Sequence, residues 1–108
     1  MLFCISWDTI IAMNTIQTTD IFDDWFGHLT DREASVSIQA RIDRAEDGNL
    51  GDCAPVGEGV SEMRIHYGPG YRVYFARRGT ELFILLAGGD KSTQSQDINT
   101  ALILAREL

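Results

Sequence analysis

The stretch of sequence that decides the fold runs from Val60 to Ala87 and reads VSEMRIHYGPGYRVYFARRGTELFILLA. Three runs rich in aromatic and β-branched residues are separated by short turns that contain glycine, a pattern typical of consecutive antiparallel strands. The predicted strands are Val60 to Tyr67, Tyr71 to Ala76 and Glu81 to Ala87. Because the last of them is apolar at successive positions, we expect it to lie at the centre of a sheet, buried on both faces.

Alternate side chains of a strand point to opposite faces of its sheet, so the predicted strands divide into two sets of residues. The apolar set should meet the helices, and it consists of Met63, Ile65, Tyr67, Tyr71, Val73 and Phe75. The opposite set contains Arg64, His66, Arg72 and Tyr74, which we expect to be exposed together on one face. A cationic and aromatic surface of this kind suits the binding of phosphates and stacked bases.

A short strand and a first helix are predicted upstream of this region. Residues 13–18 favour a strand, and Thr19 or Asp20 can then cap a helix by accepting a hydrogen bond from an amide of its first turn. The helix carries an aromatic stripe at helical spacing, which we assign to the core: Phe22, Trp25, Phe26 and Leu29.

A second helix should follow almost directly, so that the two helices form a hairpin. Thr30 and Glu33 make the capping-box pattern that opens it, and the glycine at position 48 favours its end. Residues 48–59, GNLGDCAPVGEG, are predicted to be a loop, and residues 92–108 a final amphipathic helix. The order strand, two helices, three strands and helix predicts one α+β domain.

The composition is that of a globular chain with an uneven charge distribution. The 108 residues are 44% hydrophobic and 23% charged, and the net charge is −7. Residues 1–60 hold 11 acidic and 3 basic side chains, whereas residues 61–91 hold 3 acidic and 5 basic ones. The predicted strands are therefore locally basic, which allows an anion site inside an acidic protein. Solvated acidic faces of the two helices are the alternative explanation.

Residues 1–12, MLFCISWDTIIA, are apolar but shorter than the roughly 20 residues that span a bilayer, and they lack a basic start. We predict neither a membrane segment nor a signal peptide, and we regard Met13 as a second start. Residues 1–12 are then a dispensable extension, packed on an edge strand or on a second copy in a homodimer. Cys4 and Cys53 match no metal-ligand spacing and are expected to be free thiols in the cytoplasm.

Four strings occur in a specific order along residues 13–108: FDDWFGHL, RIDRAEDGNLGD, VGEGVSEMRIHYGPGYRVYF and GGDKSTQSQDI. With these strings the chain resembles the RelE/ParE toxin superfamily, and most of all the HigB-like addiction-module killer proteins of bacteria and phages. The resemblance implies a RelE-like fold, with a helical hairpin packed on a curved, mostly antiparallel sheet. It also implies the toxin of a type II toxin–antitoxin system, whose partner is an antitoxin from the adjacent gene, often a helix-turn-helix protein.

The same resemblance implies an endoribonuclease that cuts mRNA, usually on the ribosome, and so inhibits translation without a metal or cofactor. Its 2′-hydroxyl would attack the adjacent phosphate and leave a 2′,3′-cyclic phosphate. Arg64 and Arg72 match the strand arginines that bind this phosphate, and Lys91 matches the basic residue after the last strand. His66 is a candidate general base because its unperturbed pKa lies near neutrality. Tyr74 is a candidate for base stacking or proton transfer.

Other functions remain open. The chain has Ala54 where a lysine is usual, Asn99 and Thr100 where the last helix is usually basic, and an acidic total charge. Fewer phosphate contacts mean weaker nucleic-acid binding. The alternatives are a ParE-like inhibitor of DNA gyrase without catalytic activity, and a degenerate toxin that acts as an antitoxin-binding regulatory module. In either case the strand arginines could simply form surface salt bridges with Glu62 or Glu81.

Overall fold

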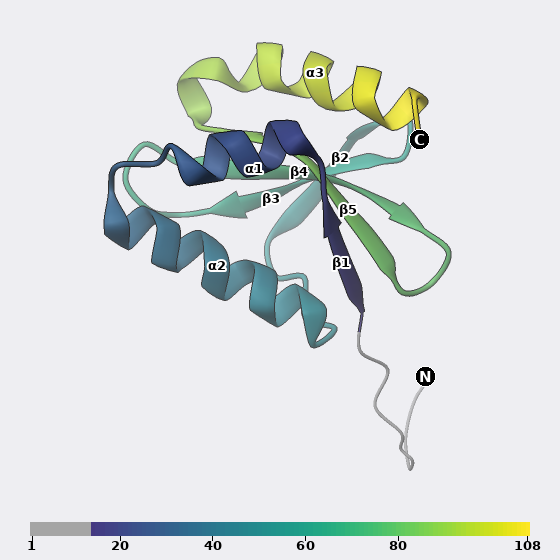
Figure 1. Cartoon of the computed structure of the whole chain (residues 1–108), viewed down its shortest axis with the longest axis horizontal. Coiled ribbons are helices and arrows are strands. Elements are labelled where there is room, and N and C mark those ends of the chain that lie inside the picture. The colour runs from purple at the N-terminus through teal and green to yellow at the C-terminus, as the bar shows by residue number, and fades with distance from the viewer. Residues whose placement is uncertain (1–13) are drawn as a thin grey trace.

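The computed structural model describes residues 14–108, and the predictions made for residues 1–12 and Met13 lie outside this part of the chain. In chain order the elements are β1 (Thr15–Thr18), α1 (Asp20–Gly27), α2 (Arg32–Glu46), β2 (Cys53–Gly57), β3 (Val60–Ile65), β4 (Tyr71–Arg78), β5 (Leu82–Gly89), the 3-10 turn η1 (Lys91–Thr93) and α3 (Gln94–Arg106). The strands form one sheet in the order β1-β5-β4-β3-β2 (Figure 1). β1 runs parallel to β5, and every other neighbouring pair is antiparallel, which confirms the predicted α+β class.

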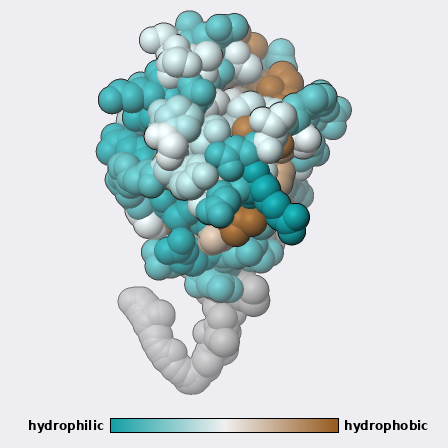
Figure 2. Space-filling model, turned by 90° about the vertical axis from the view of Figure 1, so that its left-hand side faces the viewer, coloured by the Kyte–Doolittle hydropathy of each residue, from teal (hydrophilic) through white to brown (hydrophobic). Residues whose placement is uncertain are grey.

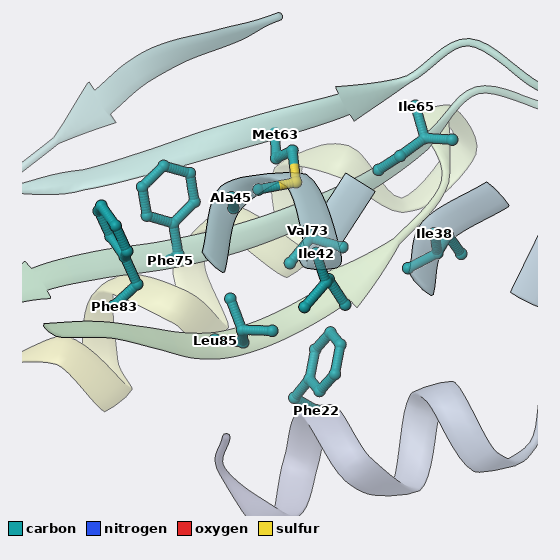
Figure 3. Packing of buried hydrophobic residues seen from close by; sticks show 10 residues of the cluster. All are labelled: Phe22, Ile38, Ile42, Ala45, Met63, Ile65, Val73, Phe75, Phe83 and Leu85. Carbon is teal, nitrogen blue, oxygen red and sulfur yellow. The ribbon is translucent and has the colours of Figure 1, made fainter. Parts of the chain in front are cut away.

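The hairpin of α1 and α2 covers one face of the sheet. Its side chains meet those of the strands in one buried cluster (Figure 3), formed by Phe22, Ile38, Ile42, Ala45, Met63, Ile65, Val73, Phe75, Phe83 and Leu85. The predicted packing of the aromatic stripe against the strands is confirmed, although only Phe22 is fully buried. Trp25, Phe26 and Leu29 are half-buried at the margin of the cluster.

The other face of the sheet is covered by α3. A second buried cluster lies between this helix and β3, β4 and β5, and it is formed by Val60, Tyr74, Ala76, Ile84, Leu86, Ala87 and Ala101. The prediction that β5 is central and buried on both faces is therefore confirmed. The expectation of an open sheet face is wrong for β4, because α3 folds back over it (Figure 1).

The prediction of a loop over residues 48–59 is wrong, because this segment contains β2. The strand pairs with β3 at the edge of the sheet, where Pro55 and a register shift between Pro55 and Gly57 are tolerated. The turn to β3 places Glu58 and Gly59 at positive φ, 51° and 80°. Ala54 consequently lies opposite Glu62 in the pairing of β2 with β3.

Local hydrogen bonds set the ends of the helices. Thr19 caps α1 as predicted, since its hydroxyl accepts a hydrogen bond of 3.0 Å from the Phe22 amide. The cap of α2 is Asp31 and not Thr30, because the Asp31 carboxylate accepts hydrogen bonds from the amides of Glu33 and Ala34. A carboxylate is favoured there by the positive end of the helix dipole. Within residues 14–108, no helix is long and apolar enough to cross a membrane.

The last two residues of β5, Gly88 and Gly89, are required by close approaches from both faces. A Cβ atom on Gly88 would overlap the ring of Trp25, and a Cβ atom on Gly89 would overlap the carboxylate of Asp97 on α3. The pair of glycines thus lets α1 and α3 pack directly on the sheet backbone at this end.

Candidate anion-binding site

Arg64 and Arg72 lie side by side at one end of the sheet. They are partners in the register of β3 and β4, so both side chains project from the same face. The turn between β3 and β4 and the start of α3 lie at this same end of the molecule (Figure 1). Figure 2 shows the molecule from this end, and most of the surface seen there is hydrophilic. The sequence-based prediction that these two arginines share a face is confirmed.

A buried carboxylate holds both arginines. Glu62 is 4% exposed, and it accepts hydrogen bonds from Arg64 Nε at 3.0 Å and from Gln94 Nε2 of α3 at 3.1 Å. Arg72 Nε lies 3.4 Å from Glu62 Oε1, close enough for ionic attraction but without hydrogen-bond geometry. The hydrogen bond with Glu62 raises the pKa of Arg64 above its usual value. The predicted alternative of salt bridges to Glu62 is thus partly realised, but with a buried acid and not on the surface.

Arg72 is the more enclosed of the two arginines, with a side chain that is 14% exposed. Its Nη1 donates a hydrogen bond of 3.0 Å to the carbonyl oxygen of Gly70, in the turn before β4. A Cβ atom on Gly70 would lie 3.8 Å from the Cβ of Lys91 and 3.5 Å from Arg72 Nη1. The exposed Lys91 of η1 therefore starts from the same corner as Arg72, as its place after the last strand suggested.

His66 lies just after β3, where it is paired with an acid from the segment before β2. Its Nε2 is 2.5 Å from Asp52 Oδ2, and the imidazole is 74% exposed. Asp52 Oδ1 is also 3.6 Å from Arg64 Nη1. The hydrogen bond from His66 and the charge of Arg64 lower the pKa of Asp52 below its usual value. This pair places a group that can exchange protons next to the arginines.

Tyr74 does not lie in the open with these residues, so that part of the prediction is wrong. The side chain is fully buried beneath α3, and its hydroxyl has no hydrogen-bond partner among residues 14–108. Burial, together with the nearby negative charges of Glu62 and Asp97, raises the pKa of Tyr74 to about 12. A side chain buried in this way is out of reach of a ligand at the surface, and Tyr74 packs in the cluster between the sheet and α3.

The comparison with known proteins gives the family. Residues 24–107 match the profile of the family described as Phage derived protein Gp49-like (DUF891). The chain belongs to this Gp49-like family. An uncharacterized protein of Haemophilus influenzae is 50% identical over 93 residues, which are 86% of this chain and 94% of the relative. No solved structure matches the chain.

The region that matches the Gp49-like family contains all the residues described above: Asp52, Glu62, Arg64, His66, Arg72, Tyr74, Lys91 and Gln94. A further residue, Arg41 of α2, holds the backbone around Asp52 and Arg64 in place. Its guanidinium donates hydrogen bonds to the carbonyl oxygens of Arg64, of Leu50 at 2.8 Å and of Asp52 at 3.2 Å. Arg41 thereby ties the loop that carries Asp52 to the strand that carries Arg64.

Two of these residues were missed by the sequence analysis. Glu62 was named only as a partner for surface salt bridges, although strand alternation places it on the same face as Arg64. Arg41 stands in the string RIDRAEDGNLGD, but nothing local shows that its partners are carbonyl groups up to 23 residues away. The described residues contain no group of three or more histidine, cysteine or acidic side chains arranged to hold a metal ion.

Proposed function

We propose that this Gp49-like protein is the toxin of a type II toxin–antitoxin system, related to the HigB-like members of the RelE/ParE superfamily. Its proposed activity is metal-independent cleavage of mRNA, and its proposed partner is the antitoxin of the adjacent gene. The observation that carries the proposal is the pairing of Arg64 and Arg72 on adjacent strands, with Lys91 at the same corner. Guanidinium groups held on a rigid sheet suit the recognition of a phosphodiester.

Preorganisation of charge supports catalysis and not only binding. In RNA cleavage by transesterification, the 2′-oxygen forms a bond to phosphorus while the bond to the 5′-oxygen breaks, and negative charge grows on the phosphoryl oxygens. Arg72 is enclosed and hydrogen-bonded to the Gly70 carbonyl, so it needs little reorientation to meet that charge. Cations fixed in advance stabilise such a transition state more than mobile ones do.

The proton of the 2′-hydroxyl must pass to a base, and His66 is the group best placed to accept it. The imidazole is exposed, lies beside the arginine pair and is oriented by Asp52. A carboxylate bound to one nitrogen leaves the other nitrogen free to accept a proton, which is the arrangement that orients histidine bases in many enzymes. The leaving 5′-oxygen takes a proton from solvent or from the histidinium.

A second function is favoured by the charge balance of the site. Glu62 offsets one of the two arginine charges, and Ala54 lies opposite Glu62 where related toxins usually supply a lysine. A site with this reduced positive charge binds RNA less tightly. A chain that keeps the surface but lacks the activity would serve as an antitoxin-binding regulatory module.

Cleavage of mRNA by the purified protein decides between the two functions. We expect cuts in the presence of ribosomes, products that end in 2′,3′-cyclic phosphate, and no effect of EDTA. Arg72→Ala should abolish cleavage and growth inhibition, whereas Arg78→Ala, at the far end of β4, should change neither. If the unaltered protein neither slows growth nor cuts RNA with ribosomes present, the ribonuclease function is wrong and the binding module is the better account.

A further inference from the structure

A hollow with two arginines lies at the same end of the sheet as the arginine pair, but on the opposite face, which is covered by α2. It encloses about 450 Å³, and its walls come from α2 and from the residues at the end of β3. The charged members of the wall are Arg41 and Arg44, a histidine, His66, stands beside them, and its apolar and aromatic members include Ile65 and Tyr67.

Arg41 and Arg44 form no salt bridge with any residue of the described part of the chain. Arg41 donates hydrogen bonds to backbone carbonyl oxygens and to no acidic side chain. Arg44, one turn further along α2, is exposed, and its one recorded bond is a long contact of 3.5 Å to the Ala40 carbonyl. The carboxylate of Asp52, whose carbonyl accepts a hydrogen bond from Arg41, is shared between His66 and Arg64. The exposed guanidinium of Arg44 can therefore bind an anion, and Arg41 adds a second positive charge on the same side of the hollow.

The hollow adjoins the proposed cleavage site at the end of β3, because His66 belongs to both. The imidazole lines the hollow and also pairs with Asp52, whose other oxygen faces Arg64. Arg41 joins the same two places, since it lines the hollow and donates to the carbonyl of Arg64. Arginine and lysine side chains therefore extend from Lys91 and Arg72, over Arg64, to Arg41 and Arg44 in the wall of the hollow.

We propose that this hollow is a subsite for a nucleotide next to the scissile phosphate of single-stranded RNA, with the phosphate on Arg44 and the base against the half-buried ring of Tyr67. The proposal rests on the ribonuclease function and names the path of its substrate. A mixed wall favours a nucleotide over a simple anion, because apolar and aromatic surface gives a base something to stack on while the arginine neutralises the backbone. Tyr67 is held in place for this role by a hydrogen bond of 3.1 Å from its hydroxyl to Asp31.

The test compares the binding of short and long oligonucleotides that cannot be cleaved. Fluorescence anisotropy would be measured with 2′-O-methyl oligoribonucleotides of two and of eight nucleotides, on the unaltered protein, Arg44→Ala, Arg72→Ala and the control Arg78→Ala. Arg44→Ala should weaken binding of the octamer on the order of tenfold, with little change for the dinucleotide, and should flatten the salt dependence by about 0.7 in log–log slope. Arg72→Ala should weaken binding of both.

The outcomes separate this proposal from the proposed function. If Arg44→Ala binds the octamer as tightly as Arg78→Ala does, the subsite is refuted, whether or not the protein cuts RNA. If the unaltered protein cuts no RNA but loses octamer binding through Arg44→Ala, the catalytic proposal fails while the path of the strand stands. Because Arg44 is exposed, its replacement should leave the melting temperature unchanged, and that measurement verifies that only the surface was altered.

Discussion

Replacement of Glu62 by glutamine should destabilise the fold and, at the same time, make RNA binding more dependent on salt. The side chain is 4% exposed and is the only acid among the buried residues described for the chain. It holds Arg64 Nε at 3.0 Å and Arg72 Nε at 3.4 Å, and these arginines face each other across β3 and β4. Glutamine keeps the shape but removes the charge, so the two guanidinium groups would repel each other without compensation.

The free energy of unfolding lost in Glu62→Gln can be estimated from the burial of Glu62 and Arg64. Breaking a buried ion pair from one side costs about 3–5 kcal/mol, and the lower end applies here because Arg64 is 37% exposed and water can take over part of its solvation. For a domain of this size, about 3 kcal/mol corresponds to a drop in melting temperature of roughly 12–24 °C. Differential scanning calorimetry of Glu62→Gln beside Glu81→Gln, an exposed acid on the turn before β5, would measure it.

The same substitution should strengthen the electrostatic part of RNA binding while it weakens the fold. With one negative charge removed, the site should release about one more counterion on binding single-stranded RNA, which steepens the log–log salt dependence by about 0.7. A melting temperature equal to that of Glu81→Gln, together with an unchanged salt dependence, would show that Glu62 neither supports the fold nor offsets the arginines. The charge balance described for the site would then be incorrect.

Two further predictions concern packing and pH. Trp25→Ala should lower the unfolding free energy by about 2–3 kcal/mol, because the half-buried ring covers Gly88. The control Ile21→Ala, on the exposed side of α1, should lower it by less than about 1 kcal/mol. Urea denaturation measures both changes. The pKa of Asp52 is lowered in the folded state, so its pairing with His66 stabilises the fold above the ordinary carboxyl pKa of 3.8 and is lost as the pH falls below that value. Asp52→Asn should therefore remove part of the stability at pH 6 and little at pH 2, and equal losses at the two pH values would contradict it.

Much of the fold could be predicted because its signals are local. The glycines at positions 68, 70 and 79 mark the turns at the ends of β3 and β4, and the aromatic stripe of α1 has the spacing of a helix. β2 was missed for the same reason, since proline and glycine signal a loop, and only pairing with β3 at the edge of the sheet makes this segment extended.

The amino-acid sequence by itself determined the order of the helices and of every strand except β2. It also placed Arg64 and Arg72 on one face, because side-chain direction along a strand follows from backbone geometry alone. Only the tertiary structure decided the chemistry around them. α3 buries Tyr74 and brings Gln94 to Glu62, a contact between residues 32 positions apart. The carbonyl groups that hold Arg41 and the acid that pairs with His66 are likewise set by packing. Burial and charge pairing depend on which elements meet, and no local pattern in the chain contains that information.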